Sequence, residues 1–197
     1  SGDILRQASQ DNIPWISIGL FYQRGFAMFA GQDASKKPIL DPRLSGFELL
    51  NDKNGIKLQL PIEIYNRTAY AQIWHKQYGT ASLYLLDTNT EFNSTEDRAI
   101  TEYLYDENFT NRLLQEVILG IGGIKLLRYL NIEPAIYHLN EGHTSFAILA
   151  LALEYLHDHE EIQTFTEAFS LVREHVVATK HTILPGALGS VEGLIAR

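Results

Sequence analysis

The stretch Ala135–His143 constrains the fold of this 197-residue chain more than any other segment. A short apolar run, residues 135–139, ends abruptly in a polar turn, and a strongly apolar segment, residues 146–156, follows. The turn consists of Asn140, Glu141, Gly142 and His143. This order predicts a buried strand that leads into a helix, and in open α/β sheets ligands collect at such strand ends. A capped helix start with ordinary turn residues explains the same pattern without a ligand.

Composition and charge exclude several classes of function. The formal net charge of −8 argues against nucleic acid and anionic membrane surfaces as partners. The absence of cysteine excludes disulfides and thiolate metal sites and favours a cytoplasmic location. No stretch of the sequence is apolar enough to span a membrane. The chain begins with Ser1 rather than Met, so we expect a fragment of a larger protein.

Hydrophobic periodicity divides the first half of the chain into a buried strand, a loop region and an antiparallel insertion. Residues 15–22 are nearly continuously apolar, as in a strand covered on both faces. Residues 31–53 are loop-like. Between residues 56 and 86 apolar side chains alternate with mostly polar ones, which predicts antiparallel strands beside a parallel sheet. We therefore expect a single domain, residues 1–197, with the loop and antiparallel insertion of residues 31–86 within it.

The second half of the chain alternates helices with short strands. Helices are predicted over residues 97–105, 108–130, 143–157 and 166–175, and a strand over residues 176–179. Strands separated by helices form βαβ units. The chain is therefore predicted to be an α/β protein with a Rossmann-like parallel sheet flanked by helices.

The helix predicted over residues 108–130 contains a glycine cluster inside its apolar pattern. The cluster, residues 120–123, does not follow a strand or open a helix, and it lacks the Lys-Ser/Thr pair or the third spaced glycine of a phosphate loop. Close packing against another helix is the better interpretation. The core-facing stripe of this helix is predicted to consist of Leu113, Val117, Ile121, Ile124 and Leu127.

Three of the predicted strands end in polar side chains. These side chains are Asp87 and Asn89, then Asn140, Glu141 and His143, and finally His181. If they converge at one edge of the sheet they form a ligand cleft, and their donors and acceptors suit a polyhydroxylated ligand. A turn and a helix cap account for the first pair without a ligand.

Other chemistries receive weaker support from the sequence. His138, Glu141 and His143 lack the one-face spacing of a metal site, because His138 is expected to point to the other side of the sheet from its neighbours, so no metal site is predicted. Ser145 has no glycine-flanked nucleophile elbow, and one carboxylate without a partner cannot define a glycosidase. Three aromatic side chains could stack on sugar rings, although aromatic residues in strands usually pack there. They are Trp74, Tyr78 and Tyr84.

A series of short motifs runs in order along nearly the whole chain. The motifs are Ser1–Ser9, Trp15–Gly25, Tyr84–Asn89 followed by Asp97 and Arg98, Arg112–Glu116 with Leu119–Gly123, Tyr137–His143 and His181–Pro185. Each motif alone is weak, but their order and spacing are highly specific. Together they resemble the α-glucan (glycogen/maltodextrin) phosphorylases, especially the short bacterial and archaeal members of that family.

The resemblance implies part of the N-terminal lobe of a two-lobed GT-B type glycosyltransferase. Such enzymes transfer glucosyl units from an α-1,4-glucan to phosphate and release glucose 1-phosphate with retention. In the family, pyridoxal phosphate is bound to a lysine of the C-terminal lobe and supplies a phosphate for proton transfer. That lysine is not in this chain, so no cofactor is expected here and the isolated chain is expected to be inactive.

The resemblance also assigns roles to individual residues. The substrate-binding residues would be Asp87, Asn89, Asn140, Glu141, His143 and His181. His181 is the expected catalytic residue, because its carbonyl and ring would hydrogen-bond the glucosyl unit and stabilise positive charge at the reacting carbon. The chain departs from the family pattern at Gly186 and in the tail to Arg197, and the family's phosphate-facing glycine loop and C-terminal lobe are absent from the sequence.

Alternatives to a phosphorylase fragment stay open. The chain could be a stand-alone, non-catalytic carbohydrate-binding or interaction module of the same fold, and a sugar-nucleotide glycosyltransferase of the same two-lobed type is a weaker option. The expected partners of the first hypothesis are an α-1,4-glucan or maltooligosaccharide, phosphate and the missing lobe. Without that lobe apolar surface would be uncovered, so we expect some self-association.

Overall fold

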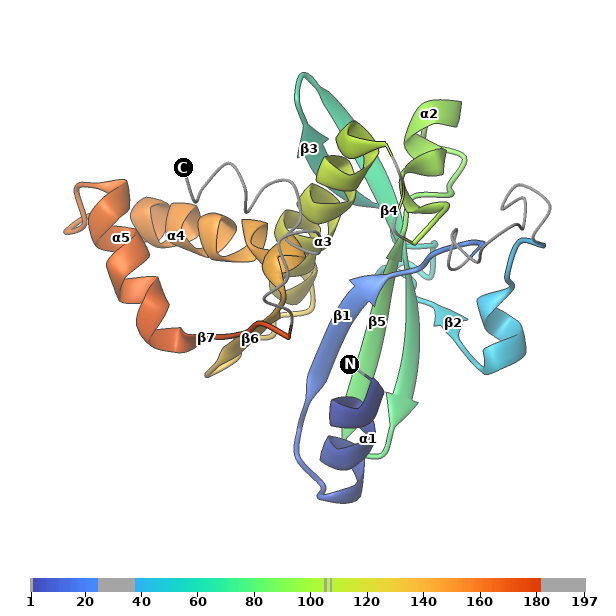
Figure 1. Ribbon diagram of the computed structural model, residues 1–197, viewed down its shortest axis with the longest axis horizontal. Helices are drawn as coiled ribbons and strands as arrows, with labels where there is room; N and C mark the ends of the chain where they lie inside the picture. The colour runs from blue at the N-terminus through green and yellow to red at the C-terminus, as the bar shows by residue number, and fades with distance from the viewer. Residues whose placement is uncertain (1, 25–37, 105, 107, 182–197) are drawn as a thin grey trace. The chain divides into compact units, whose positions relative to one another are not determined.

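The described residues form a mixed sheet, a second, parallel pair of strands and several helices, which confirms the predicted α/β class. The computed structural model describes residues 2–24, 38–104, 106 and 108–181 (Figure 1). The chain groups into two compact units, Ser1–Gln115 and Glu116–Arg197. The single domain expected over residues 1–197 stays a prediction.

The first unit contains a five-stranded mixed sheet with strand order β1-β5-β4-β2, and β3 pairs with β4 outside this path. The strands are β1 (Ile16–Leu20), β2 (Glu48–Leu49), β3 (Leu60–Ile64), β4 (Arg67–Tyr78) and β5 (Ala81–Asp87). β1 runs parallel to β5, whereas β4 is antiparallel to β5, β3 and β2. Because β5 uses one edge for β1 and the other for β4, the antiparallel strands share the sheet of β1 instead of lying beside it.

The two-residue hydrophobic period of the sequence explains which side chains of β3 are buried. Leu60, Ile62 and Ile64 are buried and alternate with exposed Pro61 and Glu63, as side chains of a strand with one wet face do. The next turn, between β4 and β5, places Gly79 at a φ of 56°, a conformation that glycine adopts at little cost.

Short helices accompany the first sheet. They are α1 (Gly2–Gln10), η2 (Pro42–Ser45), α2 (Thr95–Arg98) and η3 (Ala99–Thr101). Leu5 and Ala8 of α1 form a small core with Ala81 of β5, next to which α1 lies in Figure 1. The helix predicted over residues 97–105 starts earlier, because the Ser94 side chain accepts the Asp97 N–H and caps α2, and its helical part ends earlier, with η3 at Thr101.

The predicted loop of residues 31–53 is only partly covered by the structure. Residues 31–37 lie outside the described residues, and residues 38–53 contain η2 and β2 within an otherwise irregular segment.

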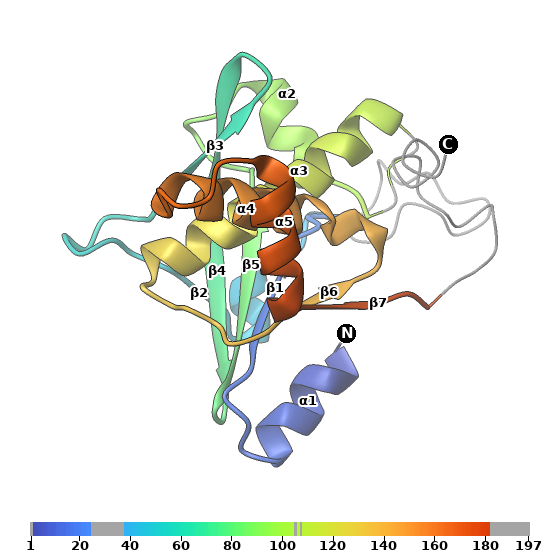
Figure 2. The same ribbon diagram turned by 90° about the vertical axis from the view of Figure 1, so that its left-hand side faces the viewer.

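The second unit contains a parallel pair of strands connected by helices. The elements are β6 (Tyr137–Asn140), η4 (Gly142–Thr144), α4 (Phe146–Asp158), α5 (Phe165–Val172), η5 (Arg173–His175) and β7 (Val176–Thr179). α4 and α5 pack through a core of Ala152, Ile162 and Ala168 (Figure 2). β6 and β7 are parallel, which confirms the βαβ unit predicted for this part of the chain. Within the described residues the two parallel pairs belong to separate sheets, and the Rossmann-like sheet stays a prediction.

α3 (Phe109–Tyr129) contains the boundary between the units and is buried on more than its predicted stripe. The predicted stripe residues Ile124 and Leu127 are buried, and Leu113, Val117 and Ile121 are half-buried. Other apolar residues of α3 are buried as well, namely Leu114, Ile118 and Leu126. Apolar residues on several faces of a helix indicate that the helix is buried on those faces.

The glycine cluster of α3 allows close approach of another helix. A Cβ atom at Gly120 would lie 2.6 Å from the Phe146 Cβ and 2.7 Å from the Ala147 backbone N at the start of α4. This geometry confirms the interpretation of the cluster as a packing feature. No helix of the described segments has the length and apolar character of a bilayer-crossing segment.

Gly120→Ala tests this packing. Alanine usually stabilises a helix interior, but here its methyl group meets backbone atoms that cannot move aside. We expect a loss of about 1–3 kcal/mol, the usual cost of overpacking, measured by urea unfolding. The control is Gly2→Ala, because a Cβ at Gly2 meets nothing within 4 Å. Equal stabilities of the two variants would contradict the packing argument.

Candidate functional site

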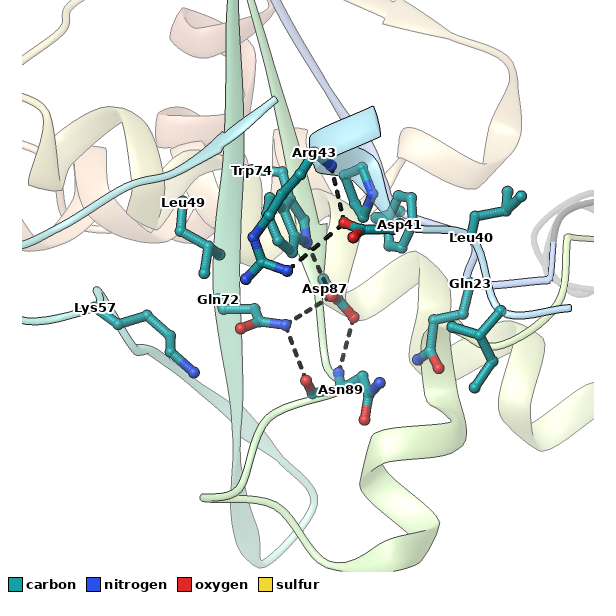
Figure 3. A pocket seen from close by; sticks show the side chains of 13 residues that line it. Gln23, Leu40, Asp41, Arg43, Leu49, Lys57, Gln72, Trp74, Asp87 and Asn89 are labelled. Carbon is teal, nitrogen blue, oxygen red and sulfur yellow. Dashed lines mark hydrogen bonds and ion pairs between the residues drawn. The ribbon is translucent and has the colours of Figure 1, made fainter. Parts of the chain in front are cut away.

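A cavity of about 420 Å³ lies beside the carboxyl end of β5 in the first unit (Figure 3). Because β1 and β5 are parallel, the residues that follow both strands reach the same edge of the sheet, where ligands collect in α/β proteins. The cavity combines an apolar wall with two cations and several amide and carboxylate groups. It is lined by Phe21, Gln23, Ile39, Leu40, Asp41, Pro42, Arg43, Leu49, Lys57, Gln72, Trp74, Asp87 and Asn89.

The Asp87 carboxylate is held on both of its oxygens. Oδ2 accepts from Gln72 Nε2 at 2.8 Å and from Trp74 Nε1 at 2.9 Å. Oδ1 accepts from the Asn89 backbone N–H at 2.9 Å and from Thr101 Oγ1 at 3.4 Å. The residue is only 2% exposed, so protein donors replace the water that a carboxylate normally binds.

Burial raises the pKa of the Asp87 carboxyl above its ordinary value of 3.8. The hydrogen bonds from Trp74, Asn89, Gln72 and Thr101 act in the opposite direction, because they stabilise the charged form, but the loss of water outweighs them. The carboxyl group therefore holds its proton more tightly in the folded chain than in the unfolded chain.

Asn89 differs from Asp87 in that its side chain is exposed and lines the cavity. Its backbone is held at two points, since the N–H donates to Asp87 Oδ1 and the C=O accepts from Gln72 Nε2 at 2.9 Å. A side-chain amide both donates and accepts hydrogen bonds, which suits a sugar hydroxyl.

Two cations border the cavity. The Arg43 guanidinium lies over the Trp74 ring, with Cζ 5.1 Å from the ring centroid, and its NH1 is 3.6 Å from Asp41 Oδ1. Lys57 Nζ lies 3.1 Å from Glu91 Oε2. These ion pairs are at the surface and contribute little to stability.

The predicted sugar-stacking aromatics contact protein groups in the sheet. The Trp74 ring faces Arg43, and the Tyr84 ring stacks on His75 with ring centroids 4.6 Å apart. The Tyr78 ring lies 5.0 Å from Lys76 Nζ. These contacts favour the packing interpretation of the three aromatic residues.

In the second unit, the ends of β6 and β7 bring three of the predicted site residues together. Glu141 Oε1 accepts the backbone N–H of His181 at 2.6 Å, and Asn140 Oδ1 lies 2.9 Å from His181 Nε2. The Glu141 N–H donates to the Thr179 carbonyl at 2.8 Å and continues the parallel pairing of the strands. His181 is thus held through its backbone and through its ring. Convergence with the residues of the first unit stays a prediction.

Glu141 adopts a strained backbone conformation, with φ of 67° and ψ of 170°. Residues other than glycine rarely occupy this region, and doing so costs about 1–3 kcal/mol. Such strain persists where surrounding contacts fix it, and here the two hydrogen bonds of Glu141 to Thr179 and His181 do so.

The remaining histidines of this region take separate positions. His143 is exposed on η4, and His138 Nε2 lies 2.6 Å from Thr179 Oγ1 across the strand pair. Within residues 2–24, 38–104, 106 and 108–181, no three histidine, cysteine or carboxylate side chains are grouped to hold a metal ion.

Two of the residues that donate hydrogen bonds to Asp87, Gln72 and Thr101, were missed by sequence reasoning. Gln72 could have been found, because it is a polar residue between apolar Ala71 and Ile73 in a strand, on the same face as Trp74. Thr101 carries no such signal, since its neighbours in η3 show no strand or helix pattern that points toward Asp87.

No protein-family model matches the chain. The chain is 38% identical over 189 residues to the maltodextrin phosphorylase of Thermococcus litoralis, which covers 94% of this chain and 22% of that protein. It is 32% identical over 198 residues to the glycogen phosphorylase of Mycobacterium tuberculosis, covering 95% of this chain and 23% of that protein. It is 31% identical over 194 residues to the glycogen phosphorylase of Aquifex aeolicus, covering 96% of this chain and 28% of that protein. The chain therefore matches less than a third of these phosphorylases, and the resemblance seen in the motifs is confirmed for that part.

The raised pKa of Asp87 predicts a pH dependence of stability. The folded state binds the proton more tightly than the unfolded state. The contribution of Asp87 to stability is therefore fully present below pH 3.8 and is lost as pH rises through the raised pKa. We expect the unfolding free energy of the wild type minus that of Asp87→Asn to fall as pH rises above 3.8 in urea titrations.

Asp52→Asn is the matched control for this titration. Hydrogen bonds from backbone N–H groups, that of Ile56 foremost, lower the pKa of the exposed Asp52 carboxyl, so its contribution to stability is lost as pH falls. The unfolding free energy of the wild type minus that of Asp52→Asn should therefore rise with pH. Slopes of the same sign for both variants would contradict the assignment of Asp87.

The strain at Glu141 predicts an unusual order of stabilities. Glycine adopts the observed conformation freely and alanine does not, so Glu141→Gly should be more stable than Glu141→Ala by about 1–3 kcal/mol in urea unfolding. Both variants lose the carboxylate, which isolates the backbone term. At exposed Glu161 the same pair should show alanine as the more stable variant, and the same order at Glu141 would argue against strain.

Proposed function

We propose that this chain is part of an α-glucan phosphorylase, which transfers glucosyl units from an α-1,4-glucan to phosphate and gives glucose 1-phosphate. The observation that carries the proposal is the similarity to maltodextrin and glycogen phosphorylases over 94% to 96% of the chain. Because the chain spans less than a third of those proteins, the activity is proposed for the full-length protein. The isolated chain is expected to be inactive.

His181 is proposed as the catalytic residue of this chain. The reaction develops positive charge at the reacting sugar carbon, and dipoles fixed in advance stabilise such charge better than mobile ones. Asn140 contacts the His181 ring and Glu141 binds its backbone N–H, which supports a histidine oriented before the sugar arrives. Asn140, Glu141 and His143 are proposed to bind substrate in the same region.

Asn89 is proposed to contact the glucosyl unit through its exposed amide. Asp87 is assigned to the same substrate-binding group. Its two oxygens are occupied by protein donors, which supports a contribution through the placement of Asn89. A maltooligosaccharide suits these groups because each sugar offers several hydroxyls to paired donors and acceptors.

Pyridoxal phosphate is proposed to bind in the full-length protein, outside this chain. A lysine that forms a Schiff base needs a neutral, desolvated amine. Among the described lysines, Lys57 lines the cavity and Lys76 lies on the same sheet, but Lys57 Nζ pairs with Glu91 and Lys76 Nζ donates to the Ser45 carbonyl at 2.6 Å, so neither fits this role. The cofactor would supply a phosphate group for proton transfer to the substrate phosphate.

The fold type, the cellular location and the partners of the full-length protein are part of the same proposal. We infer that the chain is part of the N-terminal lobe of a GT-B type enzyme and that the protein is cytoplasmic. Its partners would be an α-1,4-glucan or maltooligosaccharide, phosphate and the C-terminal lobe. Self-association of the isolated chain is expected in light scattering.

The test is release of glucose 1-phosphate from maltoheptaose and phosphate with pyridoxal phosphate added. We expect no release by the isolated chain and clear release by the full-length protein. In the full-length protein, His181→Ala should lower kcat by about a hundredfold, the usual effect of losing a preorganised dipole.

His157→Ala is the control for this assay, because His157 is exposed at the end of α4 and outside the candidate site. It should retain wild-type activity. Turnover by the isolated chain, or equal kcat of the wild type and His181→Ala, would overturn the assignment. Maltoheptaose binding without turnover by the full-length protein would favour a non-catalytic carbohydrate-binding module.

A further inference from the structure

We propose that Gln72 is a positioning residue that fixes Asn89 at the edge of the cavity. The Gln72 Nε2 donates to Asp87 Oδ2 at 2.8 Å and to the Asn89 carbonyl at 2.9 Å (Figure 3). One amide group therefore binds both the carboxylate that holds the Asn89 N–H and the Asn89 backbone itself. The role in catalysis rests on the proposed phosphorylase function, whereas the positioning does not.

The position of Gln72 in the sheet makes its amide a rigid reference point. It lies in β4, which pairs with β5 through Gln72 opposite Asp87 and pairs with β2 and β3 along its other edge. The residue is 7% exposed, so its side chain has little room to change direction. Because the Gln72 side chain is fixed relative to the sheet, a group that it hydrogen-bonds is also fixed relative to the sheet.

The segment after β5 is anchored on both sides of Asn89. Thr88 binds Thr101, and Asn93 Nδ2 donates to the Thr88 carbonyl at 2.7 Å. Thr90 Oγ1 donates to Gln59 Oε1 at 2.8 Å. Asn89 itself lies between these anchors, and its backbone carbonyl has Gln72 as its donor.

The Asn89 side chain is the group that this arrangement leaves available. Its backbone N–H and C=O are both bound, while within the described part of the chain no group hydrogen-bonds its side-chain amide. The side chain lines the cavity. A backbone fixed at two points with a free amide at its end is suited to meet a sugar hydroxyl in a defined direction.

The first arm of the test needs no ligand. Hydrogen–deuterium exchange of the Asn89 N–H is followed by NMR in the wild-type chain and in Gln72→Met, which keeps the length of the side chain and removes the amide. We expect exchange about tenfold faster in Gln72→Met, as loss of one hydrogen-bonded anchor implies.

Gln77→Met is the matched control. Gln77 lies on the same strand and also donates to a backbone carbonyl, that of Gly79 at 2.8 Å, but it lies outside the cavity lining. Exchange at Asn89 should stay within about twofold of wild type in this variant. Equal exchange in Gln72→Met and wild type overturns the proposal.

The second arm measures kcat/KM for maltoheptaose phosphorolysis in the full-length protein. Gln72→Met should lower it about tenfold, and in an Asn89→Ala background the same change should have little further effect, because a positioning residue acts through its target. Additive effects would mean that Gln72 acts only on general stability and would overturn the proposal. Failure of the wild-type protein to phosphorolyse would overturn the proposed function, while the exchange measurement would still decide the positioning by Gln72.

Discussion

A buried carboxylate must be surrounded by donors, and this requirement organises the site end of the first unit. The donors to Asp87 come from three separate segments, since Gln72 and Trp74 lie in β4, Asn89 follows β5 and Thr101 lies in η3. Removing one donor would leave a buried carboxylate oxygen with fewer hydrogen bonds and no water to replace the lost one, which lowers stability. The carboxylate therefore links the sheet to the segment that returns after it. Burial of the Asp87 carboxylate lowers the stability of the fold at neutral pH. The hydrogen bonds to the carboxylate fix the positions of the segments that donate them.

Much of the fold could be predicted because the deciding signals are local. The alternation in residues 60–64 identified a strand with one wet face, and the apolar repeat around Gly120 identified a helix in which glycine serves packing. The parallel pairing of β6 with β7 followed from a strand, a helical segment and a second strand in sequence. The pairing of β5 with both β1 and β4 could not be predicted in this way, because strand partners in a mixed sheet are chosen by tertiary contacts.

The candidate site shows the same division between local and distant information. Polar residues after strands were visible in the sequence, and these include Asp87 and Asn140. Their surroundings were not visible, because Gln72 is 15 residues from Asp87 and His181 is 41 residues from Asn140. The turn after β6 is a further example. Its positive φ falls on Glu141 and not on the neighbouring Gly142, and hydrogen bonds to Thr179 and His181 hold Glu141 in this conformation.

The two clusters fix a polar side chain by different physical means. Around Asp87, burial makes every alternative hydrogen bond unavailable, so the arrangement is held by the cost of breaking it. Around Glu141, which is half-buried, hydrogen bonds that include those to Thr179 and His181 hold the backbone in a strained conformation. The second arrangement needs less burial but stores strain. Because the Glu141 carboxylate binds the backbone N–H of His181 directly, the strained residue is also one that holds His181 in place.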